Sequence, residues 1–145
     1  MEFNSKTPER TFELGTELGA ELIGGEMILL SGGLGAGKTL FTKGILDALG
    51  YDVDEVTSPS FTLVNLYRTD RFDVYHIDLW RIDGRADAAG AVGLHEILED
   101  PKAVTIVEWS ERLTDFVFPD RVIKVYIEGD GDDPRRIEVV RVTDK

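Results

Sequence analysis

Apolar positions follow two different periods along this chain, and the period indicates which segments form strands and which form helices. Short apolar runs, and runs in which apolar and polar residues alternate, are typical of strands, whereas apolar positions three or four residues apart predict helices. The pattern predicts, in chain order, a helix that Thr7 caps and that ends at Gly24-Gly25, a strand at 27–30, a helix ending at Gly50, strands at 61–67 and 72–79, a helix at 86–98, a strand at 104–107, and strands at 122–127 and 137–142.

The first predicted helix has one apolar side. Two small residues lie on the same side, and together these positions give the helix one packing face. The side is formed by Phe12, Gly15, Leu18, Gly19, Leu22 and Ile23.

Two pairs of predicted strands are joined by connections too short to contain a helix. Four residues, 68–71, separate the strands at 61–67 and 72–79, so we expect an antiparallel hairpin there. The glycine and aspartate residues at 129–133 predict a second hairpin. The sheet is therefore expected to contain antiparallel pairs, while helices precede or follow the other strands.

A glycine-rich segment joins the strand at 27–30 to the next helix. Residues 32–39 have the sequence GGLGAGKT, which matches the phosphate-binding pattern G-x-x-x-x-G-K-[ST] known as Walker A. Glycines let several backbone N–H groups point inward at the positive end of the helix dipole, a geometry that favours polyphosphate. Lys38 is then expected to contact the outer phosphates, and the Thr39 hydroxyl to contact Mg²⁺. The alternative is an ordinary glycine-rich turn between a strand and a helix.

Phosphoryl chemistry also needs a carboxylate at the end of a neighbouring strand, and two residues qualify. Glu108 follows the apolar run 104–107 and is expected to hold the metal; the alternative is a solvated residue that begins a turn. Asp78 lies in phase with Val74 and His76 and is expected to order water or hold the metal through water. A purely structural role for Asp78, capping the turn that follows, is the alternative.

Other polar or aromatic residues carry weaker signals. Thr57 and Ser58 belong to a hydroxyl-rich loop whose composition suits closure over a γ-phosphate, but such loops are common without that role. His76 and His95 have no metal-ligand spacing, which favours packing or surface positions for both. Trp109 is by default a core or rim aromatic.

Composition narrows the classes of function. The length of 145 residues indicates one domain over residues 1–145. The absence of cysteine excludes thiol catalysis. The formal net charge is −12. The negative charge disfavours direct binding to nucleic acid or to an anionic membrane. No run of about 18 apolar residues is present, so we expect a soluble, cytoplasmic protein.

Four segments together resemble the TsaE (YjeE-like) family of P-loop ATPases, which serve the biosynthesis of threonylcarbamoyladenosine (t6A) in tRNA. The segments occur in the family's order between about Phe12 and Ile127, with family-like gaps. They are Gly33 to Thr39; Thr57-Ser58-Pro59-Ser60-Phe61-Thr62-Leu63-Val64 with Tyr67; Tyr75-His76-Ile77-Asp78-Leu79-Trp80-Arg81; and Val107-Glu108-Trp109 with Glu111.

The resemblance implies an α/β fold, a single P-loop NTPase-like domain with a mixed parallel and antiparallel sheet flanked by helices, and it implies ATP and Mg²⁺ as cofactors. It assigns Lys38, Asp78 and Glu108 to catalysis and Thr39 and Glu108 to the metal. The residues it implies for nucleotide contact are Gly33, Leu34, Gly35, Ala36, Gly37, Lys38, Thr39, Leu40, Thr57, Ser58 and Trp109.

The resemblance also implies partners. In that family the ATPase acts on a complex of TsaD-like and TsaB-like proteins, and tRNA is reached through the complex. ATP hydrolysis is then expected to be slow or dependent on the partner. Two alternatives stay open, namely a small-molecule P-loop kinase and a nucleotide-gated binding module without turnover.

Overall fold

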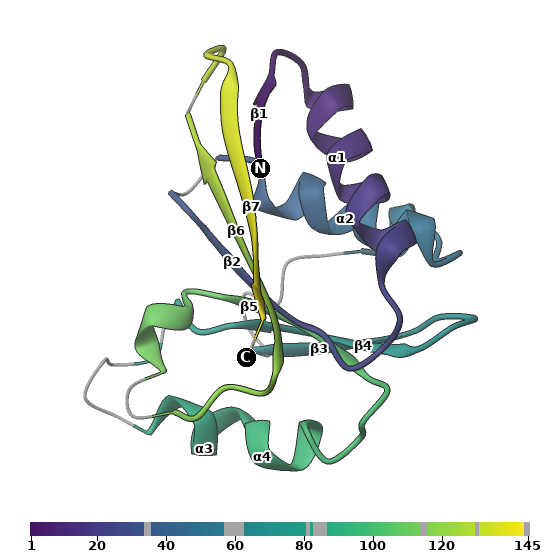
Figure 1. Cartoon of the computed structure of the whole chain (residues 1–145), viewed down its shortest axis with the longest axis vertical. Helices are drawn as coiled ribbons and strands as arrows, with labels where there is room; N and C mark the ends of the chain where they lie inside the picture. The colour runs from purple at the N-terminus through teal and green to yellow at the C-terminus, as the bar shows by residue number, and fades with distance from the viewer. Residues whose placement is uncertain are drawn as a thin grey trace.

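Seven strands form one twisted sheet with helices on both of its faces (Figure 1). The computed structural model describes residues 1–33, 36–56, 63–80, 82, 87–113, 116–129 and 131–143. The strands are β1 (Glu2–Ser5), β2 (Met27–Gly32), β3 (Val64–Arg68), β4 (Asp73–Asp78), β5 (Val104–Glu108), β6 (Arg121–Glu128) and β7 (Arg135–Thr143). The helices are α1 (Pro8–Glu21), α2 (Lys38–Ala48), α3 (Ala88–Val92) and α4 (Leu94–Ile97), with short 3₁₀ turns η1 (Val53–Glu55) and η2 (Ser110–Arg112).

The sheet has the strand order β1-β7-β6-β2-β5-β4-β3, which places β2 at its centre. Strand β2 runs parallel to both β5 and β6, and β4 runs parallel to β5. The pairs β3–β4, β6–β7 and β1–β7 are antiparallel. The expected mixed sheet and both expected hairpins are confirmed. Because β2, β4 and β5 are parallel, their carboxyl ends meet at one edge of the sheet.

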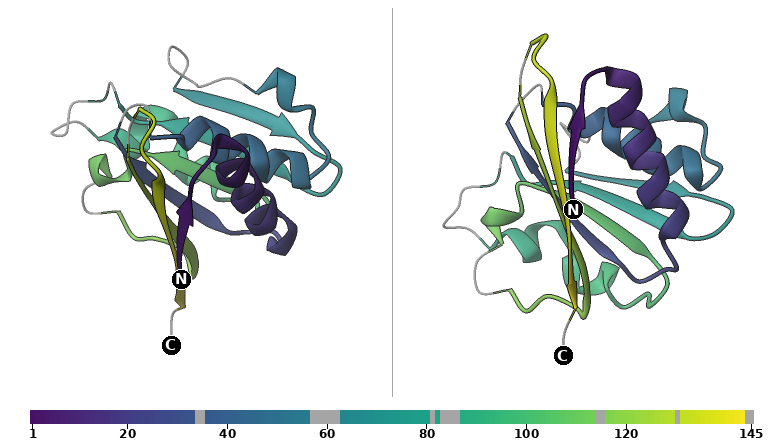
Figure 2. Two further views of the ribbon diagram at one scale, coloured as in Figure 1. Left: turned by 90° about the horizontal axis from the view of Figure 1, so that it is seen from above. Right: turned by 45° about the horizontal axis from the view of Figure 1, so that its top comes forward.

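Helices α1 and α2 cover one face of the sheet, and α3 and α4 cover part of the other (Figures 1 and 2). Close packing of α1 against α2 depends on glycine. A Cβ built on Gly15 would lie 2.2 Å from the carbonyl oxygen of Phe41, and one on Gly44 would lie 2.2 Å from that of Phe12. Any larger residue would therefore push the two helices apart, which confirms the packing role expected for Gly15 on the first helix.

Three expectations from the pattern need correction. The helix expected at 86–98 is two short helices, because Gly93 takes a left-handed conformation (φ 68°) and ends α3. Strand β1 was not predicted, since four residues at the sheet edge leave little pattern. Ile23 is 65% exposed because α1 ends at Glu21 and Leu22 continues in extended conformation.

Within the part of the chain that the structure describes, no helix has the length and apolar character needed to cross a membrane.

Candidate functional site

The glycine loop, residues 32–37, joins β2 to the first turn of α2. Gly37 precedes α2 with φ 106°, a left-handed conformation that glycine adopts without steric cost. The N-cap residue Gly37 has no side chain, so among the described residues no side-chain cap is made to the first N–H groups of α2. The N–H of Ala36 donates to the carbonyl of Gly33 (3.2 Å) just before the helix. A helix that begins this way offers its N–H groups to an anion.

Lys38, the first residue of α2, turns back toward the end of the sheet. Its Nζ donates to the carbonyl of Gly32 (2.9 Å) and lies 3.6 Å from Oε1 of Glu108. The same ammonium lies 4.8 Å from the ring centre of Trp109, within cation–π range. Lys38 is 7% exposed, so its charge is balanced mainly by protein groups rather than by water.

Glu108, the last residue of β5, is held by a second buried side chain. Its Oε2 lies 2.6 Å from Nε2 of His76 on β4, and the two residues are 4% and 0% exposed. A carboxylate has no proton to donate, so the histidine nitrogen is the donor. The Lys38 ammonium, the Glu108 carboxylate and the His76 imidazole thus form one continuous polar cluster, called the Lys38–Glu108–His76 cluster below.

The surroundings favour the ionised form of Glu108. Burial alone would raise the pKa of Glu108, but the hydrogen bond with His76 and the positive charges near the carboxylate outweigh burial. The pKa of Glu108 therefore lies below its ordinary value of 4.5. An acid that stays ionised while buried suits a metal ligand.

Asp78 lies directly beside Glu108 in the register of β4 and β5. It is partly buried, and its Oδ1 accepts from the N–H of Trp80 (2.9 Å). Burial, together with the negative charge of Glu108, raises the pKa of Asp78 above its ordinary value of 3.8, despite the opposing bond from Trp80. The bond from the Trp80 N–H shows the turn-capping role that was the alternative for Asp78, and its role toward water or metal stays a prediction.

A pair of tryptophan rings adjoins the cluster through Trp109. Trp109 has φ 61° and ψ 43°, a left-handed conformation that is costly for a non-glycine residue. This turn ends β5 and brings the indole over Lys38. The ring of Trp80 packs against that of Trp109 with centres 4.5 Å apart. Trp109 is thus a site neighbour, and the default expectation of a core or rim aromatic is incomplete.

A pocket of about 240 Å³ opens beside the glycine loop, on the side where α1 begins. Arg135 on β7 donates from Nε to the carbonyl of Ala36 (3.0 Å) and so ties the loop to the second hairpin. The lining includes Thr7, Thr11, Gly37, Leu40 and Arg135. Of the residues expected to contact nucleotide, Ala36, Gly37 and Leu40 line this pocket.

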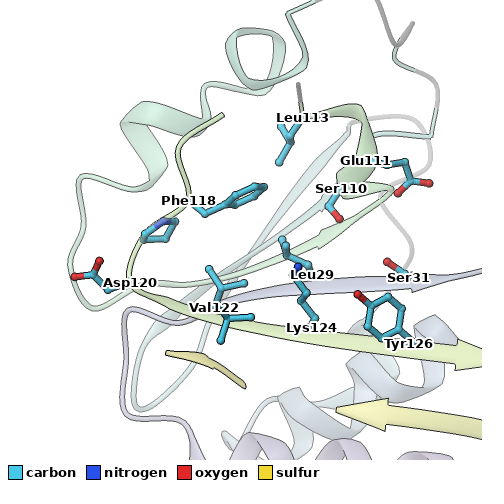
Figure 3. A pocket seen from close by; sticks show the side chains of 12 residues that line it. Leu29, Ser31, Ser110, Glu111, Leu113, Phe118, Asp120, Val122, Lys124 and Tyr126 are labelled. Atoms are coloured by element: carbon cyan, nitrogen blue, oxygen red, sulfur yellow. The ribbon is translucent and has the colours of Figure 1, made fainter. Parts of the chain in front are cut away.

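A larger cavity of about 620 Å³ lies on the sheet face opposite α1 and α2. Figure 3 shows Lys124 and Tyr126 of β6 and Leu29 of β2 on one side of it, with Phe118 from the segment after η2 on another. Ser110 and Glu111, which follow Trp109 directly, also line it. Leu30 is paired with Glu108 and shares its face of the sheet. Successive side chains of a strand point to opposite faces, so the side chain of Leu29 points away from the cluster.

The structure thus brings together Lys38, Glu108, Asp78 and Trp109, and it places Thr39 on the first turn of α2. Leu34, Gly35, Thr57 and Ser58 lie outside the described residues. His76 was expected to be a packing or surface residue, and it is instead bonded to Glu108. The sequence did contain an indication of this: His76 lies two residues before Asp78, and alternate residues of a strand share a face of the sheet.

Comparisons with known proteins give a consistent result. A model of the family described as threonylcarbamoyl adenosine biosynthesis protein TsaE matches residues 5–137. The chain is similar to a protein of Nostoc sp. strain PCC 7120 named tRNA threonylcarbamoyladenosine biosynthesis protein TsaE, with 38% identity over 72% of this chain and 65% of that protein, which is just under two thirds of its length. It is 32% identical to the Bacillus subtilis protein of the same name, over 98% of this chain and 86% of that protein. Its fold is similar to the crystal structure of Bacillus subtilis YdiB, with a TM-score of 0.75 and 30% identity over 98% of this chain and 85% of that one.

Proposed function

The chain belongs to the TsaE family, and from this membership and the geometry of the site we propose that it is a Mg²⁺-dependent ATPase that supports t6A modification of tRNA. The observation that carries the proposal is the convergence of a buried lysine, an ionised glutamate and an uncapped helix start at one edge of the sheet. Each is a part that phosphoryl transfer from a nucleotide requires.

Lys38 is the group that would contact the outer phosphates. In its present position it bonds to the Gly32 carbonyl and faces Glu108. A triphosphate would offer this ammonium stronger acceptors than a neutral carbonyl does, because hydrogen bonds between charged partners are roughly twice as strong as neutral ones. Nucleotide binding is therefore accompanied by release of Lys38 from Gly32.

Thr39 and Glu108 fit a magnesium ion as ligands. A hydroxyl and an ionised carboxylate are the hard oxygen donors that Mg²⁺ takes. Among the described residues no group of three or more histidine, aspartate or glutamate side chains forms a complete metal site. A site with few protein ligands suits Mg²⁺, which keeps several waters and takes phosphate oxygens as its other ligands. The ion would neutralise charge that develops on the phosphates.

The pocket beside the glycine loop is suited to the nucleoside. It adjoins Gly37 and Leu40 at the start of α2, so a nucleotide whose phosphates lie at the loop would place its remaining part there. Thr7 and Thr11 line the pocket from the α1 side. Asp78, beside Glu108 and with a raised pKa, is placed to accept a proton from the attacking water.

The proposed partners are a TsaD-like and a TsaB-like protein, and the family membership is the ground for this part of the proposal. The ATPase would act on their complex, and contact with tRNA would be made by the complex. The net charge of −12 agrees with that division, because a strongly acidic protein is repelled by a phosphate backbone.

The test is to incubate the purified protein with γ-labelled ATP and Mg²⁺, alone and with purified TsaD-like and TsaB-like proteins. Release of inorganic phosphate that rises with the partners supports the proposal, and a pull-down with and without ATP checks the association. Transfer of label to a metabolite would instead identify a kinase. Tight ATP binding without hydrolysis under every partner condition would identify a binding module.

A further inference from the structure

His76 is an unusual residue at its position in the sheet. Its side chain is completely buried on the face that α1 and α2 cover, where Val74, two residues earlier on β4, is apolar. Ile106, its direct neighbour on β5, is also apolar. Packing alone would therefore be served by an apolar side chain, and burying an imidazole costs free energy unless its nitrogens are paired.

Only one of the two ring nitrogens of His76 has such a partner within the described part of the chain. Nε2 bonds to Glu108, whereas Nδ1 is buried without a hydrogen-bond partner. The hydrogen bond that compensates for burying the imidazole is thus the one to Glu108. The 2.6 Å separation is short for a nitrogen–oxygen pair, as expected for a bond to an ionised carboxylate.

The bond divides the two oxygens of Glu108 between different neighbours. Oε2 faces His76, and Oε1 faces Lys38 at 3.6 Å. The terminal torsion of a glutamate is otherwise broad, so a free carboxylate would rotate between several orientations. With Oε2 fixed, Oε1 stays directed toward the start of α2, where Lys38 and Thr39 lie.

We propose that His76 is a positioning residue, which holds Glu108 so that Oε1 is presented to the divalent ion when Lys38 turns to the phosphates. The inference rests on the proposed nucleotide and metal site, and it adds a residue for which sequence spacing favoured packing. His76 does not contact the ion; it acts through Glu108. Partners of metal ligands that work this way typically contribute about 10- to 100-fold to metal affinity.

The experiment measures Mn²⁺ binding to the protein saturated with ADP, by electron paramagnetic resonance of free Mn²⁺. Separately, ADP affinity is measured in EDTA. His76→Phe removes the donor but keeps a ring of similar size, and we expect it to weaken Mn²⁺ binding about 10- to 100-fold while ADP affinity in EDTA is unchanged. His76→Gln, whose amide nitrogen reaches the Nε2 position, is expected to restore most of the loss. His95→Phe, at an exposed histidine, is the matched control.

Additivity separates positioning from a general structural role. If His76 acts through Glu108, the double variant His76→Phe/Glu108→Gln binds Mn²⁺ as weakly as Glu108→Gln alone. Losses that multiply in the double variant would overturn the inference, and so would a folded His76→Phe protein with wild-type Mn²⁺ affinity.

The inference can be tested even if His76→Phe does not fold, and its failure can be distinguished from failure of the proposed function. Should His76→Phe fail to fold, the pair His76→Gln and His76→Asn replaces it, because the shorter amide cannot reach Glu108; equal Mn²⁺ affinities of the two would overturn the inference. The proposed function fails in a different way. In that case the wild-type protein binds no ADP, or Glu108→Gln leaves Mn²⁺ affinity unchanged.

Discussion

The ends of β4 and β5 carry two carboxylates in direct register, yet their surroundings shift the two pKa values in opposite directions. At the end of β5, Glu108 is buried between His76 and Lys38, and its pKa lies below the ordinary value. At the end of β4, Asp78 is partly buried, bonds to a backbone N–H, and has its pKa raised by burial and by Glu108 itself. Two acids on adjacent strands thus differ in proton affinity: the surroundings favour the anion of Glu108, whereas they favour the protonated form of Asp78.

Removing Lys38 is expected to have the largest effect. Lys38→Ala takes away the cation that faces Glu108 and would contact the phosphates, so ATP binding should weaken more than about 100-fold. Isothermal titration with ATP and Mg²⁺ measures it. Lys43→Ala, the same change elsewhere on α2, is the control and should bind ATP normally. ATP affinity within error of wild type in Lys38→Ala would remove Lys38 from the site.

Asp78→Asn should separate binding from turnover. The amide keeps an acceptor for the Trp80 N–H but cannot take a proton, so ATP binding should persist while turnover with partners falls about 100-fold or more. Phosphate release in single-turnover assays measures the effect, with Asp73→Asn at the other end of β4 as the control. Full activity in Asp78→Asn would leave Asp78 with its structural role alone.

Glu108→Gln should act on stability and on metal binding together. Loss of the carboxylate leaves Lys38 without its buried counter-charge, which is expected to lower the free energy of unfolding by about 3 kcal/mol at neutral pH. Since the pKa of Glu108 is lowered in the folded state, its contribution is present above about pH 4.5 and is lost as the pH falls through the folded value. Urea unfolding at several pH values tests this, with Glu99→Gln on the surface as the control. A stability difference that stayed constant down to acid pH would contradict the assignment.

The smallest effect is expected for the stability of Asp78→Asn. A raised pKa means that ionisation of Asp78 disfavours the folded state, so the wild-type carboxylate is destabilising above its folded pKa and the penalty disappears as the pH falls below it. Asp78→Asn should therefore be more stable than wild type at neutral pH, by up to about 0.5 kcal/mol, with the gain vanishing in acid. The same unfolding series measures it. Reduced stability at neutral pH would show that the surroundings of Asp78 favour its charge.

Much of the site follows from local pattern because each part is encoded by neighbouring residues. The glycine loop lies between an apolar run and a helical repeat, and Glu108 directly follows an apolar run, so the sequence alone predicts where both lie. The bond between His76 and Glu108 depends on β4 and β5 being neighbours. Strand order is set by packing over the whole sheet and leaves no local trace in the sequence. Strand β1 was missed because four residues carry too little pattern, and the division of the helix because its apolar period continues past Gly93, whose left-handed conformation ends α3.

The two tryptophans of this chain, Trp80 and Trp109, form one ring pair, and Trp109 lies over Lys38. All indole emission from the protein therefore originates in one ring pair, of which Trp109 contacts the lysine that we propose turns to the phosphates. Intrinsic fluorescence is a label-free optical reporter confined to this one corner of the molecule, and stopped-flow mixing with nucleotide would time the proposed displacement of the lysine.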